Sequence, residues 1–164
     1  FLSIPLYSDV IEAFINRAGT IETIVSHSIG SFSVLYTFYR KPTLSSNNLV
    51  TLASPGEAQE FFDFYTRSLA LSAKCSTLIT NRFEELFQRT PHYFSAPIFA
   101  SSLKVPGLII HDEEDNDTSV VHSRRIHAAW KTSRLIMTKG FGHNLRSDEV
   151  VNEVINFVSR PSIA

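Results

Sequence analysis

Short continuous apolar runs alternate along this chain with longer stretches whose apolar residues recur at helical spacing. The continuous runs cover 21–25, 48–53, 105–111 and 133–138, and their β-branched content predicts buried strands. The helical spacing predicts helices over 8–17, 31–39, 119–131 and 147–160, with Ser8 capping the first. In the last helix the predicted core face consists of Val150, Val151, Val154, Ile155 and Val158. Strands separated by helices need crossover connections, so we expect an α/β fold: a parallel sheet of about four strands with flanking helices.

Residues 57–102 interrupt this alternation. They contain no convincing strand, and their aromatic and aliphatic residues have a spacing that indicates helices with a wide apolar surface. Pro91 and Pro97 divide the rest of the stretch into short pieces. We expect a helical insertion at 57–102 within a single domain that spans 1–164.

The stretch Ser26-His27-Ser28-Ile29-Gly30 lies between the predicted strand at 21–25 and the predicted helix at 31–39. A strand, a sharp turn carrying serine and a helix form the context that gives a G-x-S-x-G-type motif its meaning. Such a turn exposes the serine hydroxyl, and the helix N-terminus behind it favours negative charge. Ser26 stands where the usual first glycine would be. The alternative interpretation is that Ser28 is an ordinary helix N-cap.

An acid and a histidine follow in the order Ser…Asp…His. The loop after the strand at 105–111 holds Asp115, along with Asp117 and other acidic residues, so Asp117 is a rival for the same role. The glycine-containing loop after the strand at 133–138 holds His143, whose alternative is a solvated loop histidine. Open α/β sheets place their sites just past the C-terminal ends of strands, and all three candidates follow strands.

With these residues in place, the sequence resembles the α/β-hydrolase superfamily, in particular its serine esterases and lipases, over the C-terminal half of that fold. The resemblance implies that Ser28 is the nucleophile, His143 the base and Asp115 the acid, four residues after His111. It also implies that the N–H of Ile29 helps to form an oxyanion hole and that 57–102 is a helical cap. Asp112 departs from the family, which usually has glycine after the histidine of this strand.

The function that the resemblance implies is a serine hydrolase that cleaves small-molecule carboxylic esters through an acyl-enzyme, without a cofactor. Two alternatives stay open. One is a non-catalytic or truncated α/β-hydrolase-like module that binds a partner. The other is a peptidase or thioesterase that uses the same triad.

The family's N-terminal half would supply further strands and the second oxyanion donor. We therefore expect the strand at 21–25 to form a sheet edge, with Ile24 or Val25 covered by a homo-oligomer or by an N-terminal half. We also expect the isolated 164-residue chain to have low activity.

The composition argues against several classes of partner. A net charge of −1 argues against nucleic acid, and no apolar run approaches the length of about 20 residues that a membrane span needs. Cys75 is the only cysteine, which favours a reducing compartment and predicts a cytoplasmic protein. The acidic loop fails the EF-hand pattern because Asp117 stands where glycine is required, and the histidine spacing completes no metal site. We expect no metal.

Overall fold

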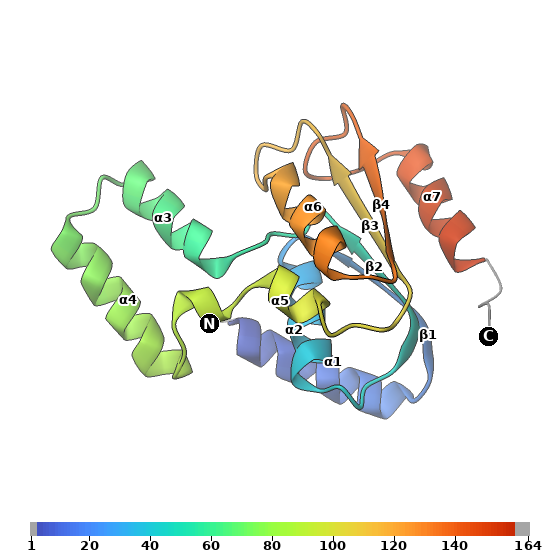
Figure 1. Cartoon of the computed structure of the whole chain (residues 1–164), viewed down its shortest axis with the longest axis horizontal. Helices are drawn as coiled ribbons and strands as arrows, with labels where there is room; N and C mark the ends of the chain where they lie inside the picture. The colour runs from blue at the N-terminus through green and yellow to red at the C-terminus, as the bar shows by residue number, and fades with distance from the viewer. Residues whose placement is uncertain (1–2, 160–164) are drawn as a thin grey trace.

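The computed structural model describes residues 3–159, so the predicted helix end at Arg160 lies outside the described residues. Its centre is a four-stranded parallel sheet with the order β1-β2-β3-β4 (Figure 1). The strands are β1 (Ile21–His27), β2 (Ser46–Leu52), β3 (Gly107–Asp112) and β4 (Ser133–Thr138). All four predicted strands are thus present, in the predicted parallel sheet with flanking helices.

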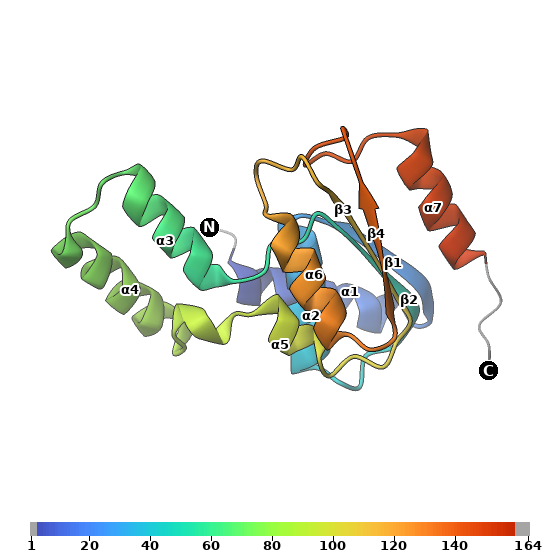
Figure 2. The ribbon, with the colours of Figure 1, turned by 45° about the horizontal axis from the view of Figure 1, so that its top comes forward.

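Helices cover both faces of the sheet, as a parallel sheet requires. One face is covered by α1 (Ile4–Ala18), α2 (Ile29–Arg40), α5 (Ala96–Ala100) and α6 (Val120–Ala129). The opposite face is covered by α7 (Asp148–Val158), and Figures 1 and 2 show α6 and α7 on opposite sides of the strands. Among the described helices, none is long and apolar enough to cross a membrane.

The first face forms the larger apolar core. Phe32 and Leu35 of α2 pack there with Phe99 of α5 and with the fully buried Trp130 at the end of α6. On the second face, Val50, Leu108 and Ile110 of the sheet pack against Val150 of α7. Every residue of β3 is buried, because it lies inside the sheet with helices on both sides.

Two details differ from the sequence predictions. Helix α1 begins at Ile4 rather than near Ser8, because Ser3 caps it by accepting the N–H of Leu6. Ser8 is buried inside the helix, where its hydroxyl accepts a hydrogen bond from Thr37 (2.9 Å).

The predicted core face of α7 was also too wide. Val150 is buried, but Val151 and Ile155 are about half exposed, at 54% and 51%. A single helix on this face presents only one stripe to the sheet, and residues one position off that stripe face solvent.

Helices α3 (Ala58–Ser68) and α4 (Ala73–Phe87) form a hairpin that projects away from the sheet, as both views show (Figures 1 and 2). A short 3-10 helix, η1 (Pro91–Tyr93), leads back to α5. An antiparallel bridge joins Glu57 to Ser95, so the segment leaves and rejoins the body at one place. Within the predicted insertion at 57–102, α5 packs in the core, and the projecting part is the α3–α4 hairpin.

Strand β1 is an edge of the sheet and pairs only with β2 among the described residues. Ile24 packs against the larger core, whereas Val25 is 52% exposed. The predicted edge is therefore present, and Val25 is the exposed apolar residue on it.

Candidate active site

Ser28 occupies a sharp turn between β1 and α2. Its φ of 53° and ψ of −127° lie in a region that non-glycine residues rarely adopt, and such strain concentrates at functional sites. Its backbone N–H donates to the carbonyl of Leu52 (2.8 Å), which fixes the turn on the neighbouring strand. Although Ser28 precedes α2, its hydroxyl caps no N–H of that helix. Ser28 therefore occupies the N-cap position without the side-chain hydrogen bond of an ordinary N-cap, and its hydroxyl is available for another partner.

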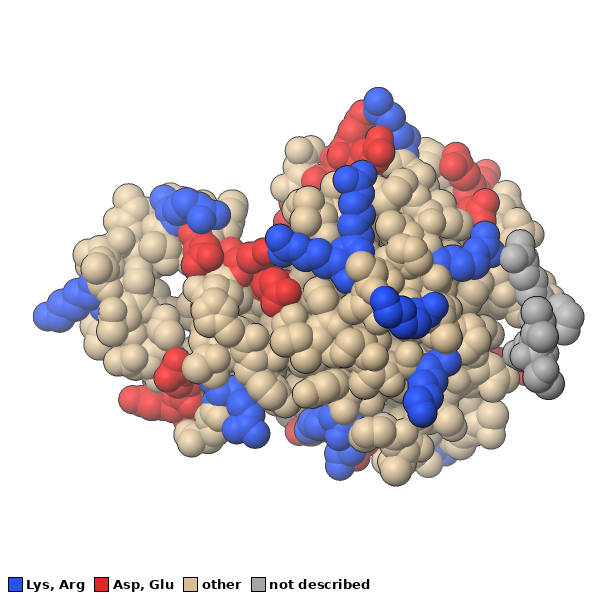
Figure 3. All heavy atoms as spheres, in the orientation of Figure 1, with Lys and Arg blue, Asp and Glu red and all other residues tan. Residues whose placement is uncertain are grey.

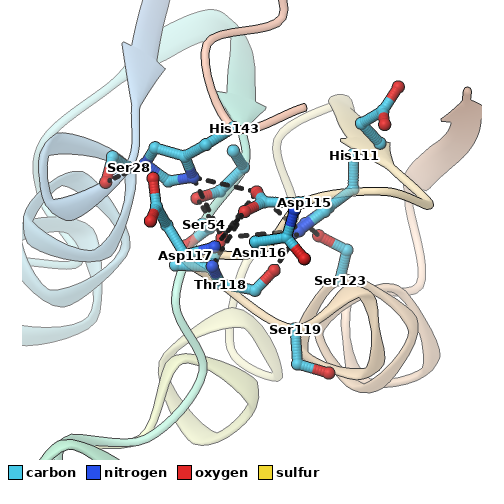
Figure 4. Close-up of polar contacts among 12 residues, drawn as sticks. Ser28, Ser54, His111, Asp115, Asn116, Asp117, Thr118, Ser119, Ser123 and His143 are labelled. Atoms are coloured by element: carbon cyan, nitrogen blue, oxygen red, sulfur yellow. Dashed lines mark hydrogen bonds and ion pairs between the residues drawn. The ribbon is translucent and has the colours of Figure 1, made fainter. Parts of the chain in front are cut away.

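That partner is His143. Its Nε2 lies 2.9 Å from Ser28 Oγ, and its Nδ1 lies 2.9 Å from Asp115 Oδ2 (Figure 4). A carboxylate can only accept, so Nδ1 carries the proton and Nε2 accepts from the serine hydroxyl. The three predicted residues thus form one hydrogen-bonded chain, although 115 positions of sequence separate Ser28 from His143.

The backbone around His143 is shaped by positive φ angles at Gly140 and Gly142 (88° and 56°), values that favour glycine. His27 Nε2–H donates to the carbonyl of His143 (2.8 Å). The His27 and His143 rings pack at 4.9 Å between centroids, so the residue before the serine also holds the histidine loop.

The side chain of Asp115 is fully buried, and its carboxylate has many donors. Oδ1 accepts the N–H groups of Asp117 and Thr118, while Oδ2 accepts the Thr118 hydroxyl (2.9 Å) and His143 Nδ1–H. Burial alone would raise the pKa of Asp115, but the Thr118 N–H, His143 and the remaining donors together hold it below its ordinary value. Asp115 is therefore an ionised hydrogen-bond partner for His143.

Asp117 is exposed, and within the described part of the chain no hydrogen bond joins its carboxylate to His143. The geometry thus favours Asp115 over its rival. Possible ligand atoms of Asp115, Asp117 and His143 do lie within 4.8 Å of one another.

His111 is a further residue beside the site, to which the sequence motifs assign no role. It is fully buried at the end of β3, and its Nε2 lies 3.2 Å from Asp115 Oδ2 and 3.0 Å from the Thr118 carbonyl. Nε2 therefore donates, and Nδ1 accepts from the Ser123 hydroxyl (2.6 Å). Burial lowers the pKa of His111, so this ring is neutral and donates to the Asp115 carboxylate. Its position four residues before Asp115, at the end of a wholly buried strand, was the available signal.

Two smaller features of the turn follow from the residues beside Ser28. Ile29 is the first residue of α2, so its N–H has no acceptor within the helix and is free to face a ligand. A methyl group at Gly30 would meet the Tyr7 hydroxyl at 3.6 Å, an ordinary contact. Packing against the described residues therefore does not require glycine at position 30.

A cavity of about 960 Å³ lies between α3, the loop that carries Asp115 and α6. Figure 3 shows acidic side chains around the hollow between the projecting hairpin and the body. Burial raises the pKa of Glu57, one of the residues that line the cavity. The acidic residues that line the cavity are Glu57, Glu60, Asp63, Glu113, Asp115 and Asp117. Its lining arginines are Arg67 and Arg125. This lining gives the cavity a negative potential.

No protein-family model matches this sequence, and no curated protein matches it. Solved structures do match the fold. A meta-cleavage product hydrolase from Pseudomonas fluorescens superimposes with a TM-score of 0.64 at 16% identity, over 96% of this chain and 71% of that chain. An esterase from Rhodococcus gives 0.66 at 14% identity, over 99% and 74%. A serine hydrolase involved in carbazole degradation gives 0.68 at 16% identity, over 96% and 71%. The chain therefore has an α/β-hydrolase fold that spans about 70% of the structures it matches.

Proposed function

We propose that this chain carries the catalytic residues of a serine hydrolase that cleaves carboxylic esters through an acyl-enzyme. The observation that carries the proposal is the hydrogen-bonded chain from Ser28 Oγ through His143 to Asp115, at 2.9 Å for each step. The strained turn at Ser28 and the α/β-hydrolase fold support it.

In the first half-reaction, Ser28 Oγ attacks the ester carbonyl carbon while His143 Nε2 takes the hydroxyl proton. The N–H of Ile29 stabilises the negative oxygen of the tetrahedral intermediate. The carbon–oxygen bond to the alcohol then breaks, and His143 gives its proton to that alcohol. An ester between Ser28 and the acyl group remains.

In the second half-reaction, His143 takes a proton from water, and the resulting nucleophile attacks the acyl carbon. The bond to Ser28 breaks, His143 returns the proton to the serine oxygen, and the carboxylic acid leaves. Asp115 accepts from Nδ1–H throughout, which holds the tautomer and stabilises the imidazolium.

Hydrolysis of matched p-nitrophenyl esters, a thioester and an anilide tests the proposal and separates it from thioesterase and peptidase activity. We expect ester cleavage to be fastest, and neutral esters to react faster than esters bearing a carboxylate, because acidic side chains line the cavity next to Asp115 and would repel a negative substrate. Ser28→Ala should abolish turnover, whereas Ser101→Ala, at an exposed serine on the end of α5, should not. Ester turnover that survives Ser28→Ala would contradict the proposal.

A further inference from the structure

Asp112 is a second fully buried carboxylate beside the site, and it belongs to no part of the Ser28–His143–Asp115 chain. It is the last residue of β3. Oδ1 accepts the N–H of Glu114 (2.9 Å), and Oδ2 accepts the Thr138 hydroxyl (2.9 Å) and the N–H of Phe141 (3.0 Å). A buried charge is very costly unless it is hydrogen-bonded, so these three donors account for its presence inside the fold.

These contacts join two loops. Glu114 lies in the loop that carries Asp115, directly before it, and Phe141 lies two residues before His143 in the loop after β4. The second loop contains Gly140 and Gly142, both with positive φ, and glycine gives a chain more conformational freedom than any other residue. His27 also holds this loop, but from the exposed edge of the sheet.

We propose that Asp112 is a positioning residue: its carboxylate fixes the loop that carries His143 to the loop that carries Asp115, so that His143 reaches Ser28 and Asp115 together. This inference rests on the proposed function for its effect on turnover. The link that Asp112 makes between the two loops, called the tether below, is a property of the fold. It can be tested without measuring activity.

An amide cannot replace this carboxylate. An asparagine has one acceptor oxygen, and its NH₂ group would face either the Glu114 N–H or the Phe141 N–H, leaving that part-buried donor without its acceptor. If the Phe141 contact is lost, the loop gains freedom at the two glycines. A displacement of about 1 Å at a catalytic group can lower the rate about a hundredfold.

The first test is the steady-state kinetics of Asp112→Asn, measured well below its midpoint of thermal unfolding. We expect kcat to fall about 10- to 100-fold with KM within about twofold, since the substrate's binding surface is unchanged. The matched control is Glu114→Gln, which removes an exposed charge from the same loop and only a long 4.0 Å ion pair to Lys139. A folded Asp112→Asn protein with normal kcat, or an equal loss in the control, would overturn the proposal.

The second test needs no variant and no substrate. In the unmodified protein, hydrogen exchange at the Phe141 amide should be at least about tenfold slower than the intrinsic rate of an exposed loop amide, because Asp112 accepts that proton. Exchange at the exposed-loop rate would overturn the tether even if Asp112→Asn fails to fold. Absence of ester turnover in the unmodified protein, with a slowly exchanging Phe141, would instead count against the proposed function alone.

Discussion

At the scale of single residues, the site is a set of hydrogen bonds whose directions are fixed by chemistry. Asp115 can only accept, so His143 must present Nδ1–H to it and Nε2 to Ser28. The spacing Ser…Asp…His and the position of each residue after a strand were readable from the sequence. The sequence also places His111 four residues before Asp115 at the end of a buried strand, but the contact between them depends on the side-chain direction there, which the sequence does not give.

Asp115→Asn should lower turnover by a factor on the order of a thousand or more, because an amide would hold the wrong tautomer of His143. Asp117→Asn should have a far smaller effect, since Asp117 is exposed and its carboxylate makes no hydrogen bond to that ring in the described structure. Steady-state kinetics of both variants decide between them. Equal losses would mean that Asp115 is not the acid.

The depressed pKa of His111 makes stability depend on pH. Burial lowers the pKa of this ring in the folded protein, while the unfolded chain binds a proton there at a pKa of about 6.5. The unfolded state therefore binds more protons below that pH, and the free energy of unfolding should fall as the pH drops from 7.5 to 5.5. Burial is also the chief cause that lowers the pKa of His122, so His122 adds to the same loss of stability at low pH.

Urea unfolding of the unmodified protein and of His111→Gln at pH 7.5 and 5.5 measures this contribution. The glutamine retains an N–H donor but does not titrate, so the loss of stability between the two pH values should shrink. An undiminished pH dependence in His111→Gln would show that His111 does not titrate as described.

At the scale of elements, hydrophobic patterning predicted all four strands and the main helices, because each strand is a short apolar run between turn residues. Its errors came from tertiary context. The start of α1 was missed because Ser3 caps the helix and Ser8 is buried against α2. The predicted core face of α7 was too wide because the sequence does not show how many helices share one face of the sheet.

Packing between β3 and the end of α6 should tolerate no side chain at Gly107. A Cβ there would lie 2.3 Å from the Trp130 ring, which is fully buried and has little room to move. We expect Gly107→Ala to destabilise the fold by about 1–3 kcal/mol. Gly30→Ala is the matched control, because its added methyl meets only an ordinary contact and α2 gains helix propensity. Equal stability of the two variants in urea unfolding would contradict this packing.

At the scale of the whole molecule, sequence reasoning predicted a parallel sheet with β1 at its edge, and the structure has both. The sequence did not show that only α3 and α4 of the predicted insertion project from the body, nor that an acidic cavity lies beside α3. Both features depend on how segments distant in the sequence pack together. The exposed apolar surface near the edge includes Val25 of β1 and a stripe along α1. The stripe consists of Leu6, Val10 and Phe14, at 47%, 56% and 67% exposure.

An unpaired strand edge beside exposed apolar residues favours association with another chain. We expect the 164-residue chain to self-associate at micromolar concentration in sedimentation velocity. Val25→Lys, which places a charge on the edge strand, should shift the distribution toward monomer. Glu22→Gln, at the other end of β1, should not; a monomeric unmodified chain would contradict the expectation.

The central claim is that Ser28 is a nucleophile activated by His143 and Asp115. Reaction with a fluorophosphonate probe, followed by peptide mapping with mass spectrometry, tests it most directly. We predict one equivalent of label on the peptide that contains Ser28, no labelling of Ser28→Ala, and strongly slowed labelling of His143→Gln. Labelling at another serine, or labelling that survives Ser28→Ala, would contradict the claim.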